Sequence, residues 1–160
     1  MFEEKYSDFL SEFGKGRKMV LSTSADGIVS SRMMSVVQQD GIFYFQTDTA
    51  LRKYSQLVKN NNAALCIDNI QIEGRAEEEG HPLKHEVFSK LFSECFRGSF
   101  DAYSSLDNER VFAVTPVFIQ RWIYNDGKPY IERFFVSEKR YTMEEYTVNN
   151  NGSISAPVFF

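Results

Sequence analysis

Three Asp-Gly pairs constrain the fold most, because each stands between two apolar stretches of the chain: Asp26-Gly27, Asp40-Gly41 and Asp126-Gly127. Both residues of such a pair accept a positive φ, which the tight turn of a β-hairpin requires. The flanking stretches therefore predict antiparallel strands: 19–23, 28–37, 42–46, 111–124 and 130–136.

Helical periodicity interrupts these strands in three places. Residues 2–13 carry apolar side chains at helical spacing and end at a glycine. A second helix is predicted to end near residue 59, with Thr49 placed to act as its N-cap. Residues 83–96 are predicted to form the third helix, followed by a loop or broken helix at 98–108.

The helices interrupt the strands rather than alternate with them. Short strands are also predicted at 63–67 and 70–77. This order favours a mostly β fold, a β-barrel with helices, over a doubly wound parallel sheet. We expect a single domain over residues 1–160, in which 137–160 is a polar C-terminal extension without an assigned structure.

The composition fits such a domain and argues against several classes of protein. The chain has 160 residues, of which 42% are hydrophobic and 15% aromatic, enough for one core. A formal net charge of −4 argues against nucleic-acid binding. We see no signal peptide and no run that could span a bilayer. Cys66 and Cys95 lack metal-ligand spacing, so we expect buried, reduced thiols in a cytoplasmic protein.

The stretch 31–53 suits a phosphate group. A predicted strand leads into Thr47 and Thr49, a helix is predicted to begin, and Lys53 stands in its first turn. Free N–H groups, the positive end of a helix dipole, hydroxyls and an ammonium can converge there on one anion. Arg32, on the neighbouring predicted strand, adds a forked donor. The sequence thus predicts a phosphorylated cofactor or ligand where sheet meets helix.

Each candidate also has a plain structural interpretation. Lys53 could be a solvated helix lysine, although a cation in the first turn opposes the helix dipole. Arg32 could point outward from its strand without a ligand. Met33 and Met34 point to opposite faces of a strand, so at most one need face a ligand. Trp122 could equally be a core or interface anchor.

Metal binding and acid–base catalysis have weaker support. His81 and His85 share a spacing of four, but no third ligand is suitably placed, so we predict surface histidines and no metal site. No pair of carboxylates stands out for proton transfer, and the catalytic residues stay unassigned.

Four short segments follow one another in a recognisable order: Val20-Leu21-Ser22-Thr23 before Asp26-Gly27, Ser31-Arg32-Met33-Met34, Ile42-Phe43-Tyr44-Phe45-Gln46-Thr47, and Lys53 before Asn60-Asn61-Asn62. This set resembles the split-barrel proteins of the pyridoxamine 5′-phosphate oxidase-like class, which bind flavin mononucleotide (FMN). The likeness is greatest to general stress protein 26 and its bacterial relatives. The resemblance implies an antiparallel Greek-key FMN-binding split barrel, and a homodimer with FMN at the subunit interface.

The resemblance also implies roles for nine residues. Arg32 and Lys53 would hold the FMN phosphate with help from Thr49. The isoalloxazine ring would be lined by these residues, the last three through their backbone: Met33, Met34, Phe45, Gln46 and Thr47. Trp122 lies in the late strand from which the partner subunit often reaches the flavin.

The resemblance implies an FMN-binding flavoprotein, an oxidoreductase that acts on a small molecule. One departure matters: the arginine-rich terminal strand of true pyridoxamine phosphate oxidases is absent from residues 153–160, so we expect little or no oxidation of that substrate. Two alternatives stay open. The protein could bind flavin, haem or a deazaflavin without catalysis, as a stress protein, or it could be a resistance protein of the nitroimidazole-reductase type.

Overall fold

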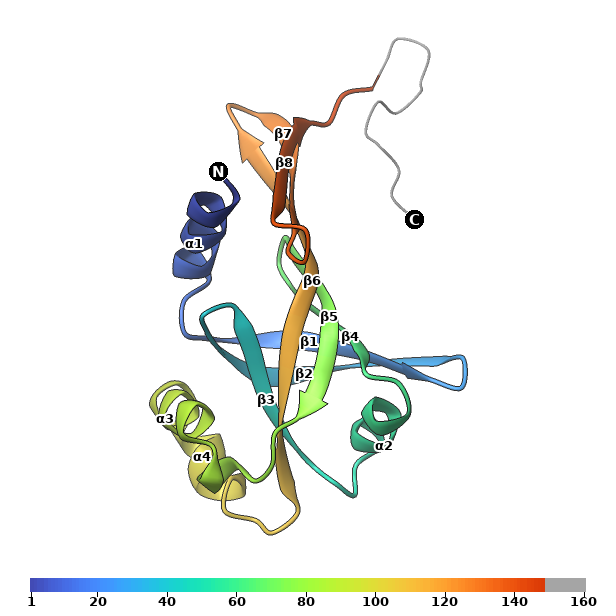
Figure 1. Cartoon of the computed structure of the whole chain (residues 1–160), viewed down its shortest axis with the longest axis vertical. Helices are drawn as coiled ribbons and strands as arrows, with labels where there is room; N and C mark the ends of the chain where they lie inside the picture. The colour runs from blue at the N-terminus through green and yellow to red at the C-terminus, as the bar shows by residue number, and fades with distance from the viewer. Residues whose placement is uncertain (149–160) are drawn as a thin grey trace.

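The computed structural model of the chain describes residues 1–148 and shows one eight-stranded antiparallel sheet (Figure 1). Its strands are β1 (Gly16–Ala25), β2 (Ile28–Gln39), β3 (Ile42–Asp48), β4 (Asn62–Ile67), β5 (Ile70–Glu78), β6 (Glu109–Asn125), β7 (Lys128–Phe135) and β8 (Arg140–Glu145). The spatial order 3-2-1-4 of the first strands is a Greek key. Because β3 also pairs with β6, strands β1 to β6 close into a barrel. The predicted fold class is confirmed.

The Asp-Gly turns form as their sequence predicts. Asp26, Asp40 and Asp126 have φ between 52° and 54°, and the glycine that follows each of them has φ between 76° and 82°. Positive φ at both central residues is the type I′ turn, whose twist matches that of the flanking strands. These turns set the register of the hairpins β1–β2, β2–β3 and β6–β7.

The helices are α1 (Phe2–Phe13), α2 (Arg52–Lys59), a 3₁₀ turn η1 (Pro82–Lys84), α3 (Glu86–Cys95) and α4 (Arg97–Tyr103). Figure 1 shows α1 beside the end of the sheet that carries β7 and β8, while α2 and the pair α3–α4 lie on either side of the other end. None of the helices in residues 1–148 is long and apolar enough to cross a membrane.

The main core fills the barrel and the space under α1. Phe9 and Phe13 of α1 pack against Phe134 of β7 and Phe43 of β3, and all four side chains are buried. A smaller cluster covers the outside of the barrel, where Phe88 and Phe92 of α3 join residues of β2 and β6. Aromatic side chains of α1 and α3 thus pack against β3 and β2, the two strands of the segment that is predicted to bind phosphate.

The barrel is split between β2 and β3. These strands pair only at their shared turn, from Val37↔Tyr44 to Gln39↔Ile42. Most of β2 pairs with β1 alone, and the end of β3 pairs with β6 alone. Both strands therefore present an unpaired backbone edge to the gap between them, and this opening positions the site.

Several local predictions need correction. The helix predicted at 83–96 is two elements, because the ring of His85 accepts the Phe88 N–H and starts α3 anew. For 98–108, where a loop or broken helix is predicted, the structure has the second form: α4 ends at Tyr103 and turns follow it. Cys66, expected to be buried, is exposed on the outer face of β4. A strand, β8, occupies part of the extension, whereas the terminal segment 153–160 lies outside the described residues.

Candidate functional site

Arg32 projects from β2 toward β1 and α2 at the split, and its hydrogen bonds go to neutral groups. Nη1 donates to Thr23 Oγ1 at 2.7 Å and to the Leu21 carbonyl oxygen at 3.3 Å, and Nη2 donates to Gln56 Oε1 at 3.2 Å. Burial lowers the pKa of the half-buried guanidinium, and the charge of Arg52 lowers it further. The arginine is thus held in place while its charge stays uncompensated.

Lys53 lies near Arg32 in the first turn of α2, as the sequence predicts. Its side chain is half-buried, and burial is the main reason that its pKa lies below 10.5. The charge of Arg32 lowers this pKa further, whereas Glu109 and Asp48 act in the opposite direction. Both causes that lower the pKa would be offset by a bound anion.

Arg32, Arg52 and Lys53 form what we call the cation cluster. Within residues 1–148, none of the three has a carboxylate within ion-pair distance. Arg52 and Lys53 are also the first two residues of α2, where the helix dipole is positive and no side chain caps the backbone N–H groups. The cluster is therefore a ready site for an anion such as a phosphate.

Three members of this site were not predicted from the sequence. Arg52 adds charge beside Lys53, while Thr23 and Gln56 hold Arg32 and are joined by a 2.6 Å hydrogen bond from Thr23 Oγ1 to Gln56 Oε1. Gln56 could have been found, because it lies three residues after Lys53 on the same side of a helix. The long-range contact of Thr23 has no local signal.

The two threonines before α2 differ in their local roles. The proposed N-cap role of Thr49 is wrong: the N-cap of α2 is Leu51. The reason is an intervening turn, in which Asp48 Oδ1 accepts the Ala50 N–H at 2.7 Å and the Asp48 carbonyl oxygen accepts the Leu51 N–H. Thr47 is buried, and its hydroxyl donates to the Asp48 carbonyl oxygen at 3.4 Å.

A cavity of ≈ 160 Å³ opens in the split between β2 and β3. Its lining comes from β2, β3, α3 and α4: Met33, Met34, Ser35, Gln46, Phe92, Ser99 and Tyr103. Three consecutive residues of β2 reach it, so the cavity meets this strand along its unpaired edge and not on one face. Three of the predicted ring-lining residues thus share one cavity.

The remaining ring-lining candidates differ in what they can offer. Phe45 is fully buried and stacks on Phe112, with ring centroids 5.6 Å apart, so its side chain belongs to the core. Its backbone, like those of Gln46 and Thr47, lies on the part of β3 whose edge faces the split. Phe45 can therefore contact a ring through its backbone, as the resemblance implies, and not through its side chain.

Trp122 is not brought to the cation cluster. It lies near the far end of β6, packs edge-to-face on Tyr146 with ring centroids 5.2 Å apart, and its carbonyl oxygen accepts a hydrogen bond from Asn69. Lys53 lies near Glu109, at the other end of this strand. Within one chain, therefore, Trp122 and the cluster are separated by the length of β6.

A comparison with protein-family models shows the family to which this chain belongs. The family model described as pyridoxamine 5′-phosphate oxidase matches residues 2–123. The chain belongs to this oxidase family. No curated protein sequence matches it significantly.

Solved structures show the same fold at low sequence identity. General Stress Protein 26 from Bacillus anthracis is 22% identical with a TM-score of 0.56, and the match covers 73% of this chain and 90% of that one. A pyridoxamine 5′-phosphate oxidase-related, FMN-binding protein from Nostoc punctiforme is 14% identical with a TM-score of 0.59, covering 82% and 87%. HutZ, the haem storage protein of Vibrio cholerae, is 17% identical with a TM-score of 0.56, covering 72% and 89%.

Both histidines of this family member are engaged in helix starts. His81 Nδ1 accepts the Leu83 N–H and His85 Nδ1 accepts the Phe88 N–H. Their Nε2 atoms lie 2.8 Å from the Leu106 carbonyl oxygen and from Glu79 Oε1, respectively. Each ring thus uses both nitrogens, and residues 1–148 contain no group of three side chains that could hold a metal ion.

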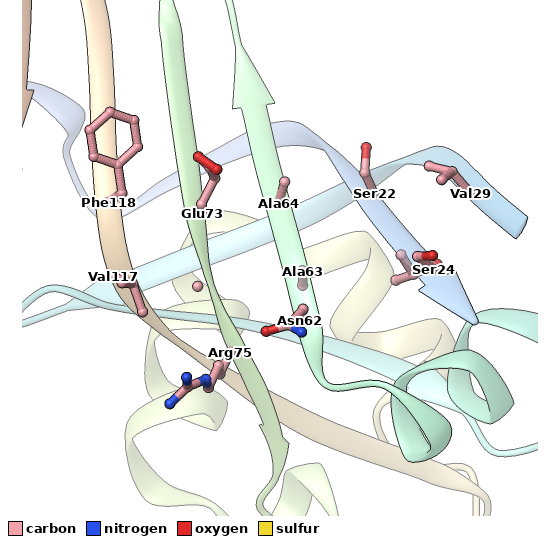
Figure 2. Close-up of a pocket in the computed structure, with 12 residues that line it drawn as sticks. Ser22, Ser24, Val29, Asn62, Ala63, Ala64, Glu73, Arg75, Val117 and Phe118 are labelled. Atoms are coloured by element: carbon pink, nitrogen blue, oxygen red, sulfur yellow. The ribbon is translucent and has the colours of Figure 1, made fainter. Parts of the chain in front are cut away.

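A second, wider groove crosses the outer face of β1, β4, β5 and β6, and contains none of the nine predicted residues (Figure 2). Its volume is ≈ 450 Å³. Figure 2 shows Glu73 and Arg75 at separate points along β5, with Val117 on the neighbouring β6 and Val29 of β2 on the opposite side of the groove. Val29 is 71% exposed and Val117 41% exposed, so this face of the family member presents apolar surface on both sides of a strand that carries opposite charges.

Proposed function

We propose that this oxidase-family member binds FMN in the split, with the phosphate on the cation cluster. The observation that carries the proposal is the half-buried pair Arg32 and Lys53, whose charges no carboxylate within residues 1–148 compensates at ion-pair distance. Half-buried like charges cost free energy unless an anion is present. The ring would extend from Arg32 along β2 toward Met34, two residues and about 7 Å further on.

We propose that the protein is an oxidoreductase acting on a small molecule. FMN, when bound, supplies a ring that accepts and releases electron pairs. The residues of this chain would bind and orient it: the cation cluster fixes the phosphate, and the unpaired edges of β2 and β3 offer backbone groups to the ring. Phe92 and Tyr103 would shield the cavity from water.

A homodimer with FMN at the subunit interface is part of the proposal. The groove of Figure 2 supports it, because Glu73 and Arg75 could pair with their counterparts across a two-fold axis. Trp122 would then act on the partner's site, since it cannot reach its own. Light scattering of FMN-loaded protein tests the idea, and a stable monomer at micromolar concentration would contradict it.

We expect pyridoxamine phosphate to be a poor substrate. A phosphorylated pyridine needs a second anion site, whereas the side chains of residues 1–148 that line the cavity in the split are all uncharged. A cytoplasmic location is also proposed, because the exposed thiol of Cys66 persists most easily in a reducing compartment. An oxidase assay on FMN-loaded protein tests the first point; turnover near 1 s⁻¹, within the usual range for enzymes of roughly 1–10³ s⁻¹, would overturn it.

The absorbance spectrum of the purified protein separates FMN from the alternatives, because flavin, haem and deazaflavin absorb differently. The structure offers a specific reason to favour flavin over haem. An axial histidine must leave one ring nitrogen free, whereas His81 and His85 both use their two nitrogens within the chain.

The decisive test compares FMN with riboflavin, which lacks the phosphate, in a Lys53→Ala variant. Loss of a charge-assisted hydrogen bond costs about 1.5–3 kcal/mol, so FMN affinity should fall about tenfold to a hundredfold. Riboflavin affinity should change little. Binding is measured by titration, and urea denaturation verifies that the variant is folded.

Lys59→Ala is the matched control, because Lys59 lies in the last turn of the same helix and pairs with Asp26 at 3.1 Å. It should leave both affinities unchanged. Equal losses of FMN and riboflavin affinity in the Lys53 variant would show that the cation cluster does not hold the phosphate.

A further inference from the structure

The cavity in the split differs from the neighbouring cation cluster in being uncharged. Its apolar wall comes from Met33, Met34, Phe92 and the ring of Tyr103, and its polar side-chain groups are two serine hydroxyls, the Tyr103 hydroxyl and the amide of Gln46. Such a lining accepts a neutral, flat group and offers few, specific hydrogen bonds. The Gln46 amide, which comes from β3, is one of these hydrogen-bonding groups.

The orientation of this amide is fixed from outside the cavity. Ser104, at the end of α4, is fully buried, and its Oγ donates to Gln46 Oε1 at 2.8 Å. The serine is itself held, because its backbone N–H donates to the Phe100 carbonyl oxygen. With Oε1 engaged, the two N–H bonds of Gln46 Nε2 are the groups left for a ligand, and Nε2 has no hydrogen-bond partner among the described residues.

We infer that Ser104 is a positioning residue that presets Gln46 as a hydrogen-bond donor, so that the cavity accepts the carbonyl or ring-nitrogen edge of a neutral aromatic ring. This inference rests on the proposed function, in which that ring is the isoalloxazine of FMN. It links α4 to the specificity of the site, although α4 contributes nothing to the cation cluster. In this arrangement the cavity selects the ring of the ligand, and the cation cluster binds its phosphate.

The test is a double-mutant cycle on Gln46 and Ser104. Gln46→Leu removes the donor and should weaken FMN and riboflavin equally, by about three- to tenfold, the value of one neutral hydrogen bond. Ser104→Ala frees the amide and should weaken both by a smaller factor. In the Gln46→Leu background, Ser104→Ala should have no further effect on affinity, because the positioned group is gone.

A spectroscopic readout accompanies the affinities. A hydrogen bond to the ring shifts the visible absorption of a bound flavin, so both single variants should shift that spectrum, whereas Lys53→Ala, which acts on the phosphate, should not. Ser93→Ala is the matched control, because Ser93 lies on α3 outside the cavity lining and its Oγ donates to the Lys90 carbonyl oxygen; it should leave the spectrum unchanged. Urea denaturation reports the fraction folded for each protein.

The outcomes separate this inference from the function on which it rests. If Lys53→Ala discriminates FMN from riboflavin but the two losses in the cycle are additive, Ser104 has only a structural role and the inference fails while the proposed function stands. The inference also fails if Gln46→Leu leaves affinity and spectrum unchanged. If the unaltered protein binds neither FMN nor riboflavin, both fail together.

Discussion

Arg32 and Arg121 are half-buried arginines on strands of the same sheet, in opposite electrostatic surroundings. Arg121 donates to Glu12 Oε2 of α1 at 2.7 Å, forms an ion pair with Glu132 of β7, and lies over the Phe9 ring. Burial alone would lower its pKa, but the hydrogen bonds to Glu12 and Glu132 outweigh this and raise it. For Arg32, burial and Arg52 act together and lower the pKa.

The difference distinguishes a structural charge from a binding charge. The charge of Arg121 is satisfied within the chain, so it joins α1 to β6 and β7. Among the described residues, the hydrogen-bond partners of Arg32 are all neutral, so its charge stays available for an external anion. The following predictions test that distinction, starting with the largest expected effect.

Arg121→Met should lower the free energy of unfolding by about 3–5 kcal/mol, because Glu132, with a side chain only 5% exposed, loses its counter-charge. FMN affinity of the folded protein should not change. Urea denaturation and FMN titration measure the two effects. Arg140→Met is the control: its pair with Glu138 is exposed, so the loss should stay below about 1 kcal/mol.

Arg32→Met should have the opposite profile, with its main effect on binding. FMN affinity should fall about tenfold to a hundredfold, by the loss of a charge-assisted contact. Arg52→Met, which removes an exposed cation of the same cluster, should cost less. A larger loss for Arg52 than for Arg32 would place the phosphate outside the barrel opening.

The pH dependence of FMN affinity should reveal Lys53. Its pKa lies below 10.5 in the free protein and would rise with a phosphate bound, so the complex holds more protons. Affinity should therefore fall as pH rises through the pKa of the free protein. Lys53→Arg, which stays charged, should remove this loss, and riboflavin reports any titration of the ring itself. If Lys53→Arg leaves the pH profile unchanged, the Lys53 ammonium is not the group whose titration weakens FMN binding.

The smallest effect concerns stability without ligand. Lys53→Met should raise the free energy of unfolding by about 0.3–1 kcal/mol at neutral pH, because it removes a cation from a helix N-terminus. The gain should shrink as pH rises from the lowered pKa toward 10.5, because the unfolded chain then binds more protons at Lys53 than the folded one. With saturating FMN, Lys53→Met should instead lower the free energy of unfolding. A loss of stability in the free protein would show that Lys53 is structurally required.

Local chemistry explains which elements the sequence could predict. The bounds of α1 follow from its apolar spacing and Gly14, and the hairpins follow from the Asp-Gly turns. Strand β8 could not be predicted, because its residues are mostly exposed and its apolar alternation is limited to Tyr141 and Met143. It forms as an added edge on β7, where Tyr141 donates a hydrogen bond to Glu132.

The site was predictable in its charges and not in its contacts. Arg32 and Lys53 carried a visible signal, a strand arginine and a lysine that opposes a helix dipole. The neutral partners of Arg32 come from β1 and α2, and Ser104 meets Gln46 across 58 positions of sequence. Such long-range hydrogen bonds depend on barrel closure and leave no periodic trace in the chain.

The pairing of β3 with β6 has a consequence for how this chain folds. Hairpins with type I′ turns form locally and within microseconds, roughly 1–10 μs, whereas β3 and β6 must meet across the loop that contains β4, β5, α3 and α4. We therefore expect the closing seam to form late in folding, and Lys53 lies near enough to Asp48 and Glu109 of that seam for their charges to raise its pKa. A ligand of the cation cluster would therefore stabilise the folded barrel by mass action. It would not speed the folding steps that precede closure.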